Sequence, residues 1–189
     1  TRADAWIRYR TWLVIAPAFL APLLLMPFTA ILAVAVVSIL CYREFARATG
    51  FFRHRSLSAI VVVGILLIAC TSLDHWYDMF MALTPLTIIV IAAVAVLPDS
   101  PHGYLQRVSL ASVAFLLFGS GLGHLGYIAN DPNYRPILLL ILVSVQLNDV
   151  FAYICGKSFG RRQLFPNTSP GKTLGGHLCA LVLTTAFAA

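Results

Sequence analysis

Long apolar segments separated by short polar linkers run through almost the whole chain. The first covers residues 12–42, and the others are expected at about 57–73, 79–97, 108–129, 136–155 and from about 177 onward. A helix needs about 20 predominantly apolar residues to cross a hydrocarbon core of about 30 Å. The pattern therefore predicts an all-α, polytopic integral membrane bundle of about six to seven transmembrane helices, in a single transmembrane domain over residues 1–189.

The first apolar segment is too long for one crossing. Residues 12–42 contain no charge, and as one helix they would rise roughly 46 Å. Pro17, Pro22 and Pro27 interrupt the segment, and proline ends or kinks a helix. We therefore expect two short helices with a turn near Pro27. This arrangement places the arginines before and after the segment on the same side of the membrane, as the positive-inside rule requires.

Composition agrees with a membrane protein and argues against other classes. Of the 189 residues, 60% are hydrophobic and 11% are charged, whereas soluble domains have about 25% charged residues. The net charge of +6 comes from bases that flank apolar segments, so membrane topology explains it better than nucleic-acid binding does. The four cysteines lack CxxC spacing and predict neither a zinc site nor a disulfide framework. We interpret them as small apolar fillers.

The distribution of basic residues predicts an orientation. Counting crossings from a cytoplasmic N-terminus places the linkers 43–56, 98–107 and 156–176 in the cytoplasm. Of the 13 Lys and Arg residues, all except Arg135 then lie on that side. We expect an integral protein of the bacterial inner membrane with residues 156–176 as a cytoplasmic motif loop. The chain starts with Thr1 and stops inside an apolar segment, so we expect a piece of a longer protein, truncated at the C-terminus.

A carboxylate stands inside the apolar segment at 136–155. Gln146, Asp149 and Tyr153 have spacings of three and four and share one helix face, with Asn148 adjacent. An acid within a membrane is energetically costly, so its default interpretation is functional. The alternatives are that Asp149 reaches the interface or pairs with a neighbouring arginine. A carboxylate beside phosphates usually indicates a divalent cation, most often Mg²⁺.

A glycine-rich basic stretch follows. Gly156 and Gly160 allow tight backbone packing, and the cations stand among Gly, Ser, Thr and Pro: Lys157, Arg161, Arg162 and Lys172. An ordinary positive-inside loop would need only the charges. A P-loop is excluded, because Pro166 occupies the position of its first glycine and no strand is expected before it.

A second polar group, at His124, has a different interpretation. It lies beside a GxxxG pair formed by Gly119 and Gly123, and Ser120 and Tyr127 share its face. We interpret these positions as close helix packing with a hydrogen-bonded histidine.

The pattern D-x-x-A-Y-x-x-G-K-x-F-G-R-R-x-L-x-P-x-x-S-P-G-K-T, residues 149–173, resembles the phosphatidate cytidylyltransferase family, also called CDP-diacylglycerol synthases. The matching positions are Asp149, Ala152, Tyr153, Gly156, Lys157, Phe159, Gly160, Arg161, Leu164, Pro166, Ser169, Pro170, Lys172 and Thr173. The resemblance implies transfer of CMP from CTP to phosphatidic acid, giving CDP-diacylglycerol and pyrophosphate in phospholipid biosynthesis, with Mg²⁺ as cofactor. The implied partners are CTP, phosphatidic acid and the lipid bilayer, without nucleic acid; a homodimer is compatible with the sequence.

The resemblance also assigns roles to residues. Asp149 would hold the metal, and Lys157 and Lys172 would act with it in catalysis. The implied substrate-binding set is Asn148, Tyr153, Arg161, Arg162, Ser169 and Thr173. The cations would bind phosphates of CTP or lipid, and the two hydroxyls would donate hydrogen bonds to phosphate oxygens. No protein nucleophile is needed, since the lipid phosphate would attack the α-phosphorus of CTP.

Two departures from the family pattern keep alternatives open. Leu174-Gly175-Gly176 stands where the family usually has W-E-G or W-Q-G, so a polar contact is absent. The family's K-D-x-G, H-G-G and D-R-x-D signature, which supplies further carboxylates, does not occur before Ala189. A chain ending there is expected to be inactive.

The alternatives are a catalytically inactive membrane protein that binds anionic lipid or a partner, and a related transferase for another phospholipid or polyprenyl lipid. A transporter is less favoured, because the chain has one clear intramembrane acid.

Overall fold

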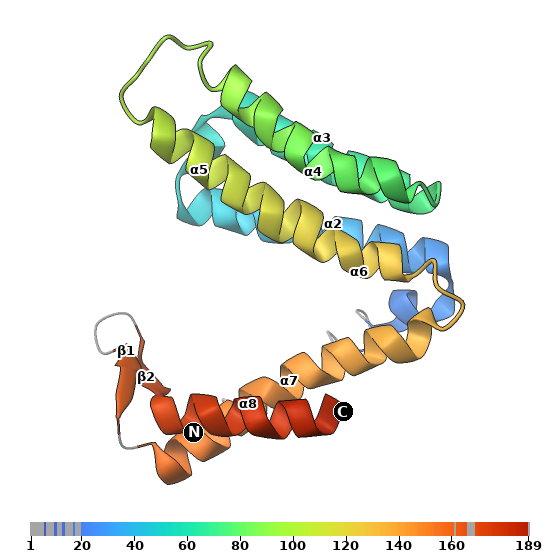
Figure 1. Ribbon diagram of the computed structural model, residues 1–189, viewed down its shortest axis with the longest axis vertical. Coiled ribbons are helices and arrows are strands. Elements are labelled where there is room, and N and C mark those ends of the chain that lie inside the picture. Colours follow the sequence, from blue (N-terminus) through green and yellow to red (C-terminus); the bar gives the residue numbers. More distant parts are fainter. Residues whose placement is uncertain are drawn as a thin grey trace. The chain divides into compact units, whose positions relative to one another are not determined.

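The computed structural model describes Trp6, Arg10, Leu13, Pro17 and residues 20–160, 162–165 and 169–188. Most of these residues are helical (Figure 1). The elements in chain order are α2 (Pro27–Ala48), η1 (Phe51–Arg53), α3 (Arg55–Leu73), α4 (Tyr77–Val94), α5 (Tyr104–Ala114), η2 (Phe115–Gly121), α6 (Leu122–Ile128), α7 (Tyr134–Phe159), β1 (Gln163–Phe165), β2 (Ser169–Thr173) and α8 (Leu174–Ala188). Contacts within the chain define two units, Thr1–Arg135 and Pro136–Ala189. The expected single transmembrane domain stays a prediction.

The predicted polytopic helical membrane fold is confirmed. Within the described residues, five helices are long and apolar enough to cross a membrane: Pro27–Ala48, Arg55–Leu73, Tyr77–Val94, Tyr104–Ile128 and Tyr134–Ser158. The fourth of these is α5, η2 and α6 in succession. The last helix, α8, is also apolar but has 15 residues. The observed helices agree with the predicted apolar segments to within a few residues at most ends, because the polar linkers mark those ends clearly.

The break expected near Pro27 is present. Residues 20–25 are helical, Met26 has extended backbone angles of φ −142° and ψ 151°, and α2 begins at Pro27. The last carbonyls of a helix lack partners within that helix. Here Arg135 supplies them, donating hydrogen bonds to the carbonyls of Leu24 and Leu25 at 2.8 and 3.0 Å. Arg135, which is distant in the sequence, thus satisfies two carbonyl groups at the helix end before the proline break.

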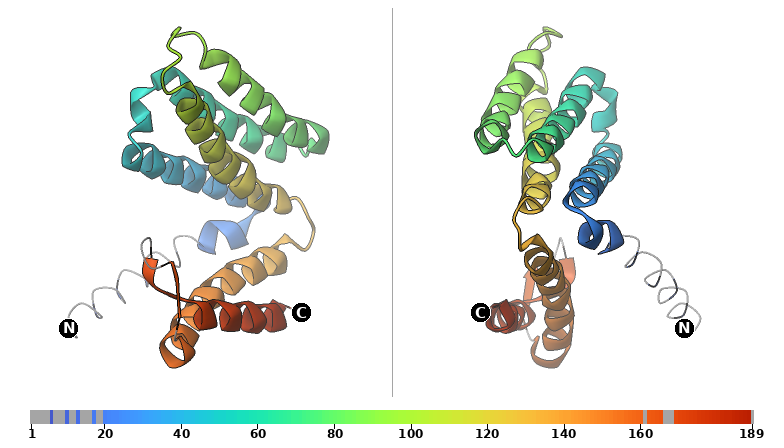
Figure 2. Two further views of the ribbon diagram at one scale, coloured as in Figure 1. Left: turned by 60° about the vertical axis from the view of Figure 1, so that its left-hand side comes forward. Right: turned by 90° about the vertical axis from the view of Figure 1, so that its right-hand side faces the viewer.

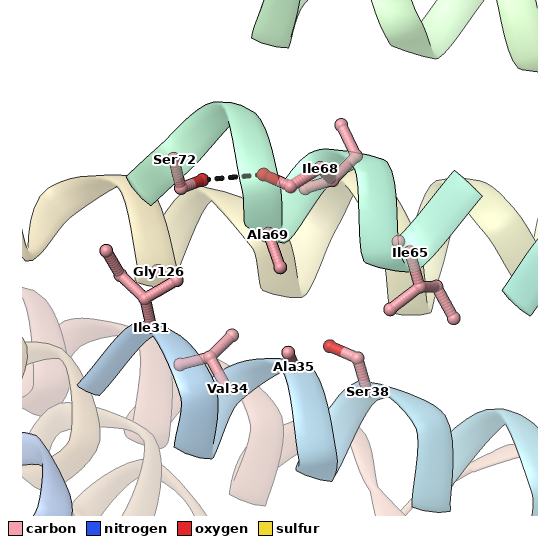
Figure 3. Close-up of a pocket in the computed structure, with 11 residues that line it drawn as sticks. Ile31, Val34, Ala35, Ser38, Ile65, Ile68, Ala69, Ser72 and Gly126 are labelled. Atoms are coloured by element: carbon pink, nitrogen blue, oxygen red, sulfur yellow. Dashed lines mark hydrogen bonds between the residues drawn. The ribbon is translucent and has the colours of Figure 1, made fainter. Parts of the chain in front are cut away.

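Small residues allow close packing in the first unit, where α2, α3, α4 and the helix formed by α5, η2 and α6 run alongside one another (Figure 2). A Cβ atom added to Gly64 of α3 would lie 2.6 Å from the ring of Phe115, which is fully buried. Figure 3 shows α2 and α3 facing each other across a small pocket that Gly126 of α6 also lines. The core of this unit therefore depends on glycine contacts between helices, as is common in membrane bundles.

The packing interpretation of His124 is confirmed. Its Nδ1 lies 2.7 Å from the carbonyl oxygen of Ser120, one turn earlier in the helix. Its ring meets that of Phe80 edge-on, with 4.9 Å between the ring centroids. The hydroxyl of Thr84 donates a hydrogen bond of 3.0 Å to the Ser120 hydroxyl. The polar groups of this helix face thus form hydrogen bonds within the bundle.

The second unit contains a feature that the sequence did not predict. The expected loop 156–176 is partly regular structure, because α7 continues through Phe159 and α8 already begins at Leu174. Between them β1 and β2 form an antiparallel hairpin, with Gln163 paired to Thr173 and Phe165 to Ser169 and an irregularity in between. Strands of 3 and 5 residues are too short to show a clear alternation of apolar and polar positions.

Candidate functional site

The motif segment, residues 149–173, is built around a close crossing of α7 and α8. A Cβ atom on Gly176 of α8 would lie 2.7 Å from the Cα atom of Gly156 on α7 and 2.9 Å from the carbonyl oxygen of Ala152. No real Cβ atom approaches backbone so closely, so the crossing requires glycine at position 176. Gly156 and Gly176 therefore fix where the hairpin leaves one helix and joins the next.

Thr173 lies at the centre of this arrangement. Its Oγ1 accepts a hydrogen bond of 3.3 Å from the backbone N–H of Gly176, in the manner of a helix N-cap. A Cβ atom on Gly156 would lie 3.2 Å from the same oxygen, and one on Gly160 would clash with it. A threonine hydroxyl that accepts one hydrogen bond still has its own O–H to donate. Thr173 can thus cap α8 and also donate to a ligand oxygen.

The polar residues near the end of α7 divide between two faces. Asn148 is partly buried, and its Oδ1 accepts a hydrogen bond of 3.4 Å from the hydroxyl of Thr184 on α8. Gln146, Asp149 and Tyr153 are exposed, and Tyr153 has 71% of its surface accessible. Asp149 has no ion pair within the described part of the chain. The structure therefore leaves its carboxylate available, whereas Asn148 takes part in helix packing.

The described cations of the motif segment are all exposed. Lys157 lies in the last turn of α7, Arg162 precedes β1, and Lys172 lies on β2. Ser169 begins β2 and is partly buried. The predicted substrate contact at Arg161 lies outside the described residues.

Asp149 and Lys157 are eight residues apart on one helix, which is a rise of about 12 Å. A direct ion pair between them is thus excluded, while a ligand several ångströms long could contact both.

A disulfide joins the two helices of this unit and corrects the interpretation of the cysteines. Cys155 of α7 is bonded to Cys179 of α8, with 6.2 Å between their Cα atoms. Cys41 and Cys70 are free. Sequence spacing could not reveal the pair, because its partners come from two helices that the glycine crossing brings together. Cys155 directly precedes Gly156, so the crossing and the disulfide are one contact region.

Asp149 fits a magnesium ion only as one ligand among several. No group of three or more His, Cys, Asp or Glu side chains within the described residues could hold a metal ion. Mg²⁺ is usually bound through one or two carboxylates together with water and substrate phosphates. A single available carboxylate agrees with that mode and does not agree with a site made by protein ligands alone.

The matching family and the named relatives agree with each other. The protein-family model described as "Cytidylyltransferase family" matches residues 6–189 of this chain. The Uncharacterized protein YnbB of Escherichia coli is 28% identical over 179 residues, which cover 92% of this chain and 59% of the relative. A protein of Pseudomonas aeruginosa named Phosphatidate cytidylyltransferase is 28% identical over 175 residues, covering 89% of this chain and 64% of the relative. One of the same name from Aquifex aeolicus is 44% identical over 50 residues, which are 26% of this chain and 19% of that protein.

The chain spans 59% and 64% of the two relatives that it matches over most of its own length. No solved structure is significantly similar to it.

Proposed function

Because the chain belongs to the cytidylyltransferase family, we propose that the protein containing it transfers CMP from CTP to phosphatidic acid. The products are CDP-diacylglycerol and pyrophosphate. The observation that most supports this proposal is the folding of the motif segment, in which the α7–α8 crossing holds an available carboxylate and a hairpin with exposed cations. Relatives named Phosphatidate cytidylyltransferase support the same substrate pair.

The proposed location is the bacterial inner membrane, with the hairpin on the cytoplasmic side, where CTP is available. The bacterial sources of the relatives and the asymmetry of Lys and Arg residues support it.

In the proposed reaction an oxygen of the lipid phosphate attacks the α-phosphorus of CTP. A new phosphorus–oxygen bond forms, the bond between the α- and β-phosphates breaks, and pyrophosphate leaves. Catalysis of this kind consists mainly of positioning and charge neutralisation. Lys157, Arg162 and Lys172 would neutralise phosphate charges, while Ser169 and Thr173 would donate hydrogen bonds to phosphate oxygens.

Asp149 would hold Mg²⁺ together with phosphates of the bound substrate. When bound, the ion would stabilise the negative charge of the departing pyrophosphate. The role of Asp149 itself is to fix one end of the phosphate chain, while Lys157 and Lys172 contact other oxygens.

The test is pyrophosphate release by the intact protein with CTP, phosphatidic acid and Mg²⁺. Asp149→Asn keeps the side-chain shape and removes the charge, and it should lower kcat by about 10²-fold or more. The matched control is Asp99→Asn, since Asp99 lies in the linker after α4 and its φ of 46° suits asparagine. The control should retain wild-type activity. Undiminished activity of Asp149→Asn would exclude the metal-binding role, and absence of pyrophosphate release by the wild type would exclude the proposed reaction.

A further inference from the structure

An open groove lies between the last turns of α2 and the first turns of α3, and η1 closes it at one side. We call it the arginine groove. Tyr42, Arg43 and Arg47 line it from α2, and Phe52, Ser58 and Val62 line it from η1 and α3. Gly50 makes this geometry possible, because its left-handed φ of +71° reverses the chain directly after α2. All these residues belong to the first unit, and none lies in the motif segment.

The floor and the open side of the groove are suited to a hydrocarbon chain. Tyr42 is 3% exposed, and its hydroxyl donates a hydrogen bond of 2.6 Å to the hydroxyl of Ser58. The two hydroxyls therefore satisfy each other in the floor. Phe52 is 55% exposed and Val62 partly buried, so an aromatic ring and an aliphatic side chain line the open side. An acyl chain that lies along this side would cover both apolar side chains.

One wall of the groove carries more positive than negative charge. Arg43 and Arg47 are four residues apart and project from the same face of α2. Arg47 contacts Glu44 at 3.3 Å, but both side chains are well exposed, so this contact is weak. Arg43 has no acidic partner within the described residues. Between residues 43 and 55 four arginines stand against one glutamate, at the end of a membrane-spanning helix.

We propose that the arginine groove binds one anionic phospholipid from the surrounding bilayer. The phosphate lies against Arg43 and Arg47 at the level of the lipid headgroups, and an acyl chain follows Phe52 and Val62 toward the membrane interior. Basic pockets between membrane helices bind anionic headgroups in this way. A zwitterionic lipid is disfavoured, because its cationic group would be held near the two arginines. The bound lipid joins α2 to α3, so it stabilises the first unit.

This proposal does not rest on the proposed reaction, because the groove shares no residue with the motif segment. It is tested with lipids that are not the proposed substrate. The intact protein in detergent is titrated with phosphatidylglycerol or phosphatidylcholine, and native mass spectrometry gives the apparent Kd of the first bound lipid. The wild type should prefer phosphatidylglycerol. Arg43→Gln/Arg47→Gln should raise its Kd about fivefold for each arginine and leave that of phosphatidylcholine unchanged.

The matched control is Arg53→Gln/Arg55→Gln. It removes the same charge from the same end of the helices, at two exposed arginines that do not line the groove. Its Kd for phosphatidylglycerol should stay within about twofold of wild type. Equal losses in both double variants would mean diffuse surface attraction and would overturn the proposal. Parallel loss of phosphatidylcholine binding in the groove variant would also overturn it.

A third variant tests the groove without changing its charge. Val62→Trp places a large ring in the open side of the groove and keeps both arginines. It should weaken phosphatidylglycerol binding and reduce the increase in Tm that this lipid gives the wild type. Unchanged binding and an unchanged increase in Tm would show that the lipid does not occupy the groove.

Discussion

Thr173 combines two tasks in one hydroxyl group. The oxygen accepts a hydrogen bond from the backbone N–H of Gly176, and its proton remains available for a ligand. Replacing an N-cap Ser or Thr by a residue without a hydroxyl costs about 1 kcal/mol. Thr173→Val should therefore lower the free energy of unfolding by about that amount, while Thr173→Ser should stay near wild type. Thermal unfolding of the intact protein in detergent measures both. Equal stability of the Val and wild-type proteins would contradict the capping role.

The same residue shows what the sequence could and could not predict about the site. The order of Asp149, Lys157 and Lys172 and their polar character suggested an available acid near cations, and all three are exposed. The cap at Thr173 and the contact between Asn148 and Thr184 depend on how α7 and α8 meet. Such partners are separated along the chain and become neighbours only in the folded unit. Their catalytic and binding roles stay predictions.

At the scale of elements, the α7–α8 crossing makes a sharp prediction. A Cβ atom at position 176 would stand 2.7 Å from the backbone of α7, and backbone cannot move aside as a flexible side chain can. Gly176→Ala should lower the free energy of unfolding by about 1–3 kcal/mol and lower activity with it, because the hairpin loses its fixed position. The matched control is Gly171→Ala, since a Cβ atom there meets nothing within 4 Å.

Thermal unfolding and pyrophosphate release of the two glycine variants check this prediction. A Gly171→Ala protein as damaged as Gly176→Ala would mean that the hairpin, rather than the helix crossing, is the sensitive element. A Gly176→Ala protein with wild-type stability would show that the helices separate at little cost.

The properties of the helices and strands also explain which parts of the fold could be predicted from the sequence. Apolar segments bounded by polar linkers predicted the long helices, because membrane insertion imposes both length and hydrophobicity. Pro27 marked a real break, since a proline at the start of a helix needs no N–H partner. The hairpin and the disulfide between Cys155 and Cys179 were missed. The hairpin was missed because strands of 3 and 5 residues are too short to show an alternating pattern. The disulfide was missed because its two cysteines become neighbours only where α7 and α8 cross.

For the whole molecule, the open question is orientation across the membrane. The positive-inside rule predicts that the 98–107 linker and the hairpin lie on the cytoplasmic side and that the 130–135 linker lies outside. A single cysteine at Ser100 or at Asn133 can report this, because both residues are exposed in their linkers. The free thiols Cys41 and Cys70 are first replaced by serine to remove background labelling.

In intact bacteria a membrane-impermeant maleimide should label Asn133→Cys, and it should label Ser100→Cys only after the membrane is opened. The physical reason is that basic residues flanking short linkers resist translocation. The helix after the 130–135 linker, α7, is long and apolar enough to cross the membrane once. With one crossing, external labelling of Asn133→Cys means that the hairpin lies on the cytoplasmic side. The reverse pattern would place Asp149, Lys157 and Lys172 on the side without CTP. A cytidylyltransferase reaction at this site would then be excluded, whatever the family of the chain.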